Sequence, residues 1–255
     1  MLKFESDLSQ AVERRELRLH YQPMISFAED RIVGFEALLR WQHPERGLIY
    51  PQEIISVAED TGLIVPIGTW VMEEACGKMV DWQRQHRKMR DFSMSVNLSS
   101  QQVMQPDLVE IIVRVLDETR LNPSCLRLEL TESVIMENAE SVVGKISQLR
   151  SLGVQVHVDD FGTGYSSLSY LQRLPVDTLK IDRTFISQMG NHNGSTRIVD
   201  TIITLGRNLG LSVAAEGVET AEQAAELKAL NCEYGQGFFY YRPLEGSAVE
   251  ALLAS

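Results

Sequence analysis

The chain has 255 residues, of which 44% are hydrophobic and 23% are charged, so it can bury one large core or two small ones. Its 24 lysines and arginines stand against 35 aspartates and glutamates, and the net charge of −11 argues against a general nucleic-acid-binding surface. A small anionic substrate stays possible, because metal ions can reverse the local potential of an acidic site.

The cysteines and the N-terminus concern the cellular environment. The three cysteines, at 76, 125 and 232, are far apart and show no CxxC spacing, which is typical of free, buried thiols in a reducing compartment. No stretch approaches ~18 uninterrupted apolar residues. Glu5 and Asp7 stand where a secretory signal has a basic region and an apolar core. We therefore expect a cytoplasmic protein without membrane contact.

Apolar runs of strand length alternate along the chain with longer segments of helical periodicity. An amphipathic helix is expected first, over Phe4–Arg15. The expected strands are Arg18–Met24, Val33–Leu38, Phe92–Asn97, Leu126–Thr131, Val154–Asp159, Thr178–Ile181, Ser212–Glu216 and Tyr234–Phe238. The expected helices between them are Pro51–Asp60, Pro66–Arg84, Pro106–Thr119, Ala139–Leu152, Thr196–Leu209 and Glu222–Leu230.

This alternation predicts the fold class. Eight expected strands separated by helices, without a Pro/Ser-rich linker or a low-complexity tract, favour one closed α/β barrel over two domains. An open, doubly wound parallel sheet is the competing topology. We expect one domain that spans residues 1–255.

Polar side chains stand at the carboxyl ends of the expected strands, where a barrel of this type assembles its active site. Convergent carboxylate and amide oxygens suit Mg²⁺ or Mn²⁺. The five histidines show no metal-ligand pairing such as HExxH, which makes zinc the poorer fit. In chain order the strand-end residues are Glu36, Arg40, Asn97, Glu129, Glu132, Asp159, Asp160, Lys180, Asp182, Glu216 and Gln236.

Each of these residues also has a structural interpretation. Asp159 and Asp160 repel each other, so a fold that keeps both usually holds a cation between them, although an acidic turn is the alternative. Glu36 and Glu129 lie in apolar strands, where an unpaired carboxylate is costly, and this favours metal ligation. Asn97 could cap the following helix. The remaining structural alternatives are an ion pair of Lys180 with Asp182, a helix-terminus role for Glu132, and a tight turn around Gln236.

Six motifs carry a family resemblance. They are Glu36–Arg40, Asn97-Leu98-Ser99, Glu129-Leu130-Thr131-Glu132, Asp159–Leu168, Leu179-Lys180-Ile181-Asp182 and Ala215-Glu216-Gly217-Val218-Glu219. In this order they resemble the EAL-type cyclic-di-GMP phosphodiesterase family, named for Glu36-Ala37-Leu38 as it stands here. The match extends from Tyr21 to Pro243.

The resemblance implies a modified (β/α)8 TIM-type barrel whose first strand is antiparallel to its neighbour. It implies hydrolysis of cyclic-di-GMP to linear 5′-pGpG in bacterial second-messenger signalling, with two Mg²⁺ or Mn²⁺ ions per active site. It also implies a homodimer. The helix expected within residues 1–16 resembles the junction that follows an upstream sensor or GGDEF-type domain in such proteins.

The same resemblance implies roles for individual residues. Glu36, Asn97, Glu129 and Asp159 would hold the first ion, and Asp159 would bridge to a second ion that Asp160 shares. Lys180 would orient the attacking water, and Glu216 would act as general base or as a partner of the second metal. Arg40 would meet a phosphate oxygen, while Gln22, Asp182 and Gln236 would contact the substrate. Glu132 would hold the loop Phe161–Leu168, which would couple dimerisation to completion of the metal site.

Two other functions compete with this interpretation. The first is a catalytically silent receptor module that binds the same dinucleotide. The second is a glycosidase barrel with paired carboxylates, which Asn97 and the Asp159-Asp160 pair disfavour. Two positions depart from the family pattern: Glu53-Ile54 replaces the usual aromatic after Pro51, which we interpret as packing, and His157 stands where a small apolar residue is expected. We interpret it as a core histidine whose ring nitrogens have partners.

Overall fold

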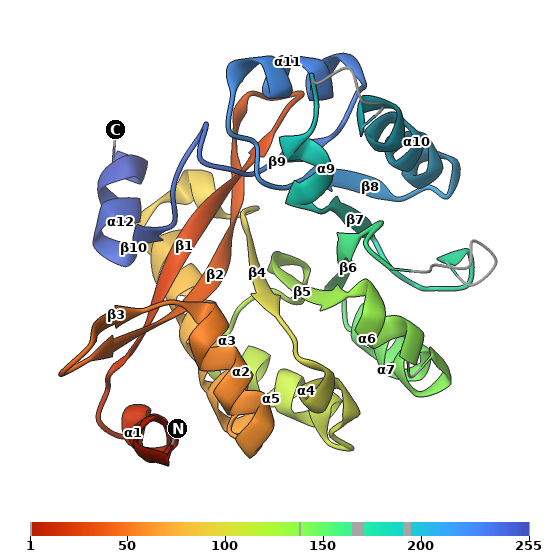
Figure 1. Ribbon diagram of the computed structural model, residues 1–255. Coiled ribbons are helices and arrows are strands. Elements are labelled where there is room, and N and C mark those ends of the chain that lie inside the picture. The colour runs from red at the N-terminus through yellow and green to blue at the C-terminus, as the bar shows by residue number, and fades with distance from the viewer. Residues whose placement is uncertain (1, 138, 165–170, 191–194, 255) are drawn as a thin grey trace.

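The computed structural model describes residues 2–137, 139–164, 171–190 and 195–254. In this part of the chain, eight strands close a barrel in the order β1-β2-β4-β5-β6-β7-β8-β9 (Figure 1). Strand β1 is antiparallel to both of its neighbours, and the other neighbouring strands are parallel. This confirms the predicted barrel with an antiparallel first strand. The strands are β1 Leu17–Ser26, β2 Arg31–His43, β4 Ser93–Asn97, β5 Leu126–Thr131, β6 Gln155–Phe161, β7 Thr178–Ile181, β8 Ser212–Ala215 and β9 Tyr234–Gly235.

Helices cover the outside of the barrel. Figure 1 shows α2 and α3 beside the β1–β2 pair, and α10 and α11 at the opposite end of the molecule, while α5 packs on α3. The helix α5 buries Leu108, Ile112 and Val115, which recur at the three- and four-residue spacing of one helix face. The helices are α1 Leu2–Ala11, α2 Pro51–Thr61, α3 Ile64–Gln85, α4 Ser100–Met104, α5 Leu108–Thr119, α6 Glu132–Glu137, α7 Ala139–Ser151, α9 Arg183–Ser187, α10 Ser195–Asn208, α11 Ala221–Ala229 and α12 Gly246–Ala254.

The barrel differs from the sequence prediction mainly in its short elements. Two strands outside the ring, β3 Gly47–Ile49 and β10 Leu244–Glu245, were not expected, nor were α9 and α12. The helix expected over Pro106–Thr119 corresponds to α5, and the short helix α4 that precedes it is a separate element. The first helix ends at Ala11 instead of Arg15, because Arg15 has the left-handed φ of 54° that turns the chain into β1.

A bulge in β6 positions two of the predicted metal ligands. The register between β6 and β7 shifts between Val158 and Phe161. Within this bulge Asp160 adopts a φ of 53°, which is uncommon for a residue other than glycine. Because a bulge re-aims side chains, neighbouring Asp159 and Asp160 need not point to opposite faces of the sheet. None of the described helices is long and apolar enough to cross a membrane.

Candidate active site

Lys180 lies at the centre of the predicted site. Its side chain, from β7, is only 1% exposed. Its Nζ lies 2.5 Å from Glu129 Oε2, 2.5 Å from Glu216 Oε1, 3.2 Å from Asp159 Oδ1 and 3.9 Å from Glu36 Oε2. These carboxylates come from β2, β5, β6 and the residue after β8, so the carboxyl ends of different strands converge as predicted.

Asp159, Asp160 and Glu216 form the part of this cluster best suited to a metal. One oxygen from each of them lies within 4.8 Å of the others. Two buried oxygens in the cluster, Glu129 Oε1 and Asp159 Oδ1, accept no hydrogen bond in the described structure, although the latter lies at ion-pair distance from Lys180. Buried unpaired oxygens and an all-oxygen donor set fit a divalent cation such as Mg²⁺ or Mn²⁺.

The pKa values of the clustered carboxylates show that negative charge is in excess at this site. Burial raises the pKa of Glu129 to about 8, with Lys180 opposing the shift and the carboxylates of Glu36 and Asp159 adding to it. Burial likewise raises the pKa of Glu216 well above its ordinary value. One ammonium group therefore does not balance the buried carboxylates, and a bound cation would favour their charged forms.

Lys180 and Asp160 are shifted by the same crowding. Burial lowers the pKa of Lys180, but the carboxylates of Asp159, Glu129 and Glu216 outweigh it, and the pKa lies well above its ordinary value. Burial, together with the neighbouring carboxylates of Asp159 and Asp182, raises the pKa of Asp160 to about 6. Lys180 therefore stays charged while its neighbours compete for protons.

Glu36 is held by two amide side chains. Asn97 Nδ2 donates a hydrogen bond of 2.8 Å to Glu36 Oε1, and Gln236 Nε2 donates to Glu36 Oε2. Gln236 Nε2 also lies 3.4 Å from Gln22 Oε1, and Gln22 Nε2 donates to the carbonyl of Tyr241 at 3.1 Å. Gln22 and Gln236 thus meet beside Glu36, although they are 214 positions apart in sequence.

The helix cap expected as an alternative for Asn97 belongs to another residue. Ser99 caps α4 and accepts a hydrogen bond from Gln102 N at 3.2 Å. Asn97 donates through Nδ2, and its Oδ1 accepts no hydrogen bond from the described residues. The amide oxygen is therefore open to a ligand.

Glu132 begins α6 and holds the loop that follows β6. Its Oε2 accepts a hydrogen bond of 2.9 Å from the N–H of Gly162. A Cβ atom at Gly164 would lie 2.7 Å from Glu132 Oε1, so the loop passes close to the carboxylate. The far part of the predicted loop, 165–168, lies outside the described residues. Glu132 is thus both a helix-terminus residue and an anchor for the start of the loop.

Asp182 and His157 differ from what the sequence suggested. Asp182 caps α9, where its Oδ1 accepts from Thr184 N at 3.0 Å, and no ion pair joins it to Lys180 in the described structure. Contact of Asp182 with a substrate stays a prediction. His157 is buried and both of its ring nitrogens lack hydrogen-bond partners among the described residues, so the expectation of a satisfied histidine is wrong. Its Nδ1 lies 3.9 Å from Glu129 Oε1.

A cleft of about 610 Å³ adjoins this cluster and includes Gln22, Arg40, Glu216 and Gln236 in its lining. Arg40 Nη1 donates to the carbonyl of Leu39 at 2.7 Å, while its buried Nε makes no hydrogen bond in the described structure. Several further residues that line the cleft were not among the predicted site residues. For the aromatic ones, the available signal was an aromatic side chain near a predicted site residue. The further residues are Tyr50, Arg183, Glu219, Phe238 and Arg242.

Two of these aromatic rings pair with arginines of the cleft. The guanidinium carbon of Arg40 lies 5.3 Å from the ring centre of Tyr50, and that of Arg242 lies 4.3 Å from the ring centre of Phe238. Such pairs hold planar groups in place at the rim and leave cationic edges facing the cleft. The cleft can therefore receive a ligand that has both planar rings and negative charge.

The fold and the site define a class of protein: a barrel with an all-oxygen cation site and a buried lysine at the carboxyl ends of its strands. The chain belongs to the EAL domain family of cyclic-di-GMP phosphodiesterases, and the family matches residues 5–243. It is 46% identical over 254 residues to the bifunctional diguanylate cyclase/cyclic di-GMP phosphodiesterase MucR of Pseudomonas aeruginosa, a match that covers 100% of this chain and 36% of MucR.

Two further comparisons agree. The chain is 39% identical over 253 residues to the cyclic di-GMP phosphodiesterase NbdA of Pseudomonas aeruginosa, with 99% of this chain and 32% of NbdA covered. The structure of the PaMucR phosphodiesterase in complex with c-di-GMP superposes with a TM-score of 0.93 at 45% identity, covering 97% of this chain and 99% of that chain. The chain spans about a third of the length of the curated relatives it matches.

Proposed function

We propose that this chain hydrolyses cyclic-di-GMP to linear 5′-pGpG and requires Mg²⁺ or Mn²⁺. The observation that carries the proposal is the cluster around Lys180, in which carboxylates from four strands surround one ammonium group at the edge of a cleft. The family, and the cyclic-di-GMP phosphodiesterase activity for which MucR and NbdA are named, support the choice of substrate.

The donor set assigns residues to two ions. Glu36, Asn97, Glu129 and Asp159 would hold one ion, and Asp159 and Asp160 would hold the other with Glu216 beside it. The fit rests on the unpaired Glu129 Oε1 and Asp159 Oδ1 and on the three oxygens within 4.8 Å. Ions bound there would neutralise charge on the phosphodiester and lower the pKa of water.

The side chains of the chain itself would orient the reactants. The buried Arg40 Nε lacks an acceptor in the described structure, and a non-bridging phosphate oxygen would supply one. Lys180 would donate a hydrogen bond that orients the attacking water, and Glu216 would accept the proton that this water loses. The water oxygen would bond to phosphorus as the P–O3′ bond breaks, and the proton taken up by Glu216 would pass to the departing O3′, leaving a 5′-phosphate and a 3′-hydroxyl.

Substrate contacts and assembly complete the proposal. Gln22 and Gln236 line the cleft, where they and Asp182 would contact the nucleotide. We extend the proposal to a homodimer in which Glu132 and the loop 161–168 link the interface to the metal site. The greater length of the relatives, and the cyclase in the name of MucR, support an upstream GGDEF-type or sensor domain in the whole protein.

The test is a chromatographic assay for linear product, with purified chain, cyclic-di-GMP and either Mg²⁺ or Mn²⁺. We expect conversion that EDTA abolishes and that Glu36→Ala lacks, while Glu118→Ala, at an exposed position on α5, retains it. Calorimetric binding of the nucleotide without any conversion would favour the silent receptor. If the chain neither binds nor converts the nucleotide, the assignment of the substrate is overturned.

A further inference from the structure

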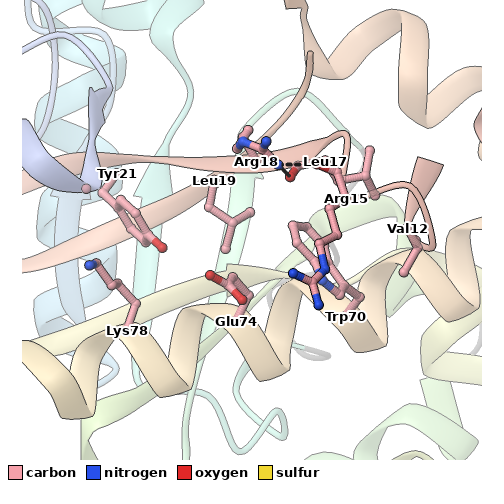
Figure 2. A pocket seen from close by; sticks show the side chains of 10 residues that line it. Val12, Arg15, Leu17, Arg18, Leu19, Tyr21, Trp70, Glu74 and Lys78 are labelled. Atoms are coloured by element: carbon pink, nitrogen blue, oxygen red, sulfur yellow. Dashed lines mark hydrogen bonds between the residues drawn. The ribbon is translucent and has the colours of Figure 1, made fainter. Parts of the chain in front are cut away.

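A second cavity lies outside the barrel, between β1 and α3 (Figure 2). Its volume is about 440 Å³, within the range of small-molecule sites. Strand β1 separates it from the active site, because Tyr21 lines this cavity and the next residue, Gln22, lines the catalytic cleft. The lining residues that carry the argument below are Arg15, Arg18, Tyr21, Trp70, Glu74 and Lys78.

The periodicities of the two elements create this lining. On β1, Leu17, Leu19 and Tyr21 lie on one face, as every second side chain of a strand does, and Arg18 also contributes to the lining. On α3, Trp70, Glu74 and Lys78 recur every four residues, so they form one stripe on the helix. The charged residues of the α3 stripe therefore face a mostly apolar row on β1. The helix and the strand leave a space between them.

Tyr21 is the first sign of a missing partner in this cavity. Its side chain is buried, with the residue only 3% exposed, and no described residue forms a hydrogen bond with its hydroxyl. Figure 2 shows this hydroxyl pointing into the space toward α3. Burial raises the pKa of the hydroxyl well above its ordinary value, so it keeps its proton and can both donate and accept. The hydroxyl faces the cavity, so a ligand there would be within its reach.

The charges around the cavity are the second sign. Lys78 pairs with Glu250 at 2.6 Å, but neither Arg15 nor Arg18 forms an ion pair in the described structure. Arg18 Nη1 donates to the carbonyls of Arg15 and Leu17 at 2.5 and 2.7 Å, and these neutral acceptors leave its charge uncompensated. Arg15 and Arg18 are exposed, and even with the carboxylate of Glu74 the lining of this cavity keeps a net positive charge in a chain of net charge −11.

We propose that this cavity binds a nucleoside monophosphate. Trp70 is half-buried and offers an indole face on which a base can stack. Arg15 and Arg18 would bind the phosphate, which charge-assisted hydrogen bonds to guanidinium groups favour. The carboxylate of Glu74 would accept a hydrogen bond from an N–H group on the base, and the hydroxyl of Tyr21 would bond to the base or the ribose.

Tryptophan fluorescence can test the proposal directly. Trp41 and Trp82 are fully buried, so Trp70 is the tryptophan that a ligand in this cavity would contact. The full chain is titrated with GMP and with AMP in EDTA, where no metal recruits the phosphate to the catalytic cleft. We expect saturable quenching with both nucleotides and much weaker effects with guanosine or inorganic phosphate alone. Trp70→Phe should remove the signal, while calorimetry still reports binding weakened by at most about tenfold.

Matched variants separate this site from the catalytic one. Arg15→Gln should weaken GMP binding by about tenfold or more, as expected for losing a charge-assisted contact. Arg14→Gln is the control, because Arg14 bonds to Gln10 and lies outside the cavity lining. Tyr21→Phe should also weaken binding without lowering the melting temperature.

Three outcomes would overturn the proposal. The first is no binding of either nucleotide up to millimolar concentration, and the second is equal binding by Arg14→Gln and Arg15→Gln. The third is loss of binding in a folded Arg40→Ala variant, which would place the nucleotide in the catalytic cleft instead. None of these outcomes affects the assay for cyclic-di-GMP hydrolysis, so the two proposals fail separately.

Discussion

Lys180 Nζ lies 2.5 Å from Glu129 Oε2, and both side chains are almost fully buried inside the barrel. Their neighbours are further carboxylates, so this pair is the core of a cluster in which acids outnumber bases. Buried ion pairs contribute little net stability, because desolvation offsets their attraction, but removing one partner is strongly destabilising. The pair is better explained by the proposed chemistry of the cluster than by stability.

Lys180→Met should lower both stability and hydrolysis, because carboxylates outnumber bases in this cluster. Methionine has similar length but no charge, so the carboxylates lose their common cation. Without added metal we expect the free energy of unfolding to fall by about 3–5 kcal/mol, and hydrolysis to fall at least about 100-fold even with metal. Denaturant titration and the chromatographic assay measure the two effects. Lys228→Met is the control, because its ion pair with Asp30 at 2.7 Å is exposed and should change stability by less than about 1 kcal/mol. Unchanged stability in Lys180→Met would contradict the assigned geometry.

Glu132 should be replaceable by glutamine but not by alanine. Glutamine keeps a carbonyl oxygen that can accept the hydrogen bond from Gly162 N, whereas alanine leaves this N–H without its partner. We expect Glu132→Ala to lower the rate of hydrolysis about tenfold and Glu132→Gln to retain most of it. The melting temperature of each variant checks that the fold is intact. Equal rates in the two variants would mean that the hydrogen bond to the loop does not matter.

Metal affinity should increase with pH. Asp160 and Glu129 have pKa values of about 6 and 8, and both must lose their protons before they bind a cation. Raising the pH from 6 to 8 removes those protons, so we expect the dissociation constant for Mn²⁺ to fall over this range. Calorimetry in buffers of different ionisation enthalpy would measure proton release on binding. A dissociation constant independent of pH would argue that these carboxylates are already ionised.

Without metal, the same carboxylates should make the protein less stable as the pH rises, whereas the affinity for metal increases with pH. Their pKa values are raised on folding, so the folded state binds more protons than the unfolded state between the unfolded value of 4.5 for glutamate and about 8 for Glu129. The free energy of unfolding then falls as the pH rises through this window. Saturating Mn²⁺ should reduce the effect, which thermal denaturation with and without metal can measure.

His157→Leu should stabilise the protein. Burial lowers the pKa of His157 well below its ordinary value, and both ring nitrogens lack hydrogen-bond partners in the described structure. Leucine removes these unsatisfied groups, so we expect the free energy of unfolding to rise by about 1–2 kcal/mol at neutral pH. The gain should increase below pH 6.5, because only the unfolded histidine then takes up a proton. Denaturant titrations at pH 5.5 and 7.5 measure both effects, and Ser95→Ala tests whether other buried polar changes on the barrel strands do the same.

Local sequence patterns were sufficient for the main elements of the fold. The apolar runs at Leu126–Thr131 and Thr178–Ile181 coincide with β5 and β7, because short buried strands between polar segments leave a clear signal. The carboxylates at the ends of these runs predicted a shared site, since parallel strands bring their carboxyl ends together. The two-residue strands β9 and β10 are too short to show a period, so pairing with β1 defines them.

The sequence by itself determined the barrel, the family and an acidic site with Lys180 among its candidates, since hydrophobic period and motif order are local properties. That Lys180 lies at the centre of the site was decided by the tertiary structure. Only the tertiary structure decided which amides hold Glu36, that Ser99 rather than Asn97 caps α4, and that His157 lacks partners. It also decided the cavity between β1 and α3. These are relationships between side chains brought together from distant parts of the chain, and they depend on distances and directions that no local pattern encodes.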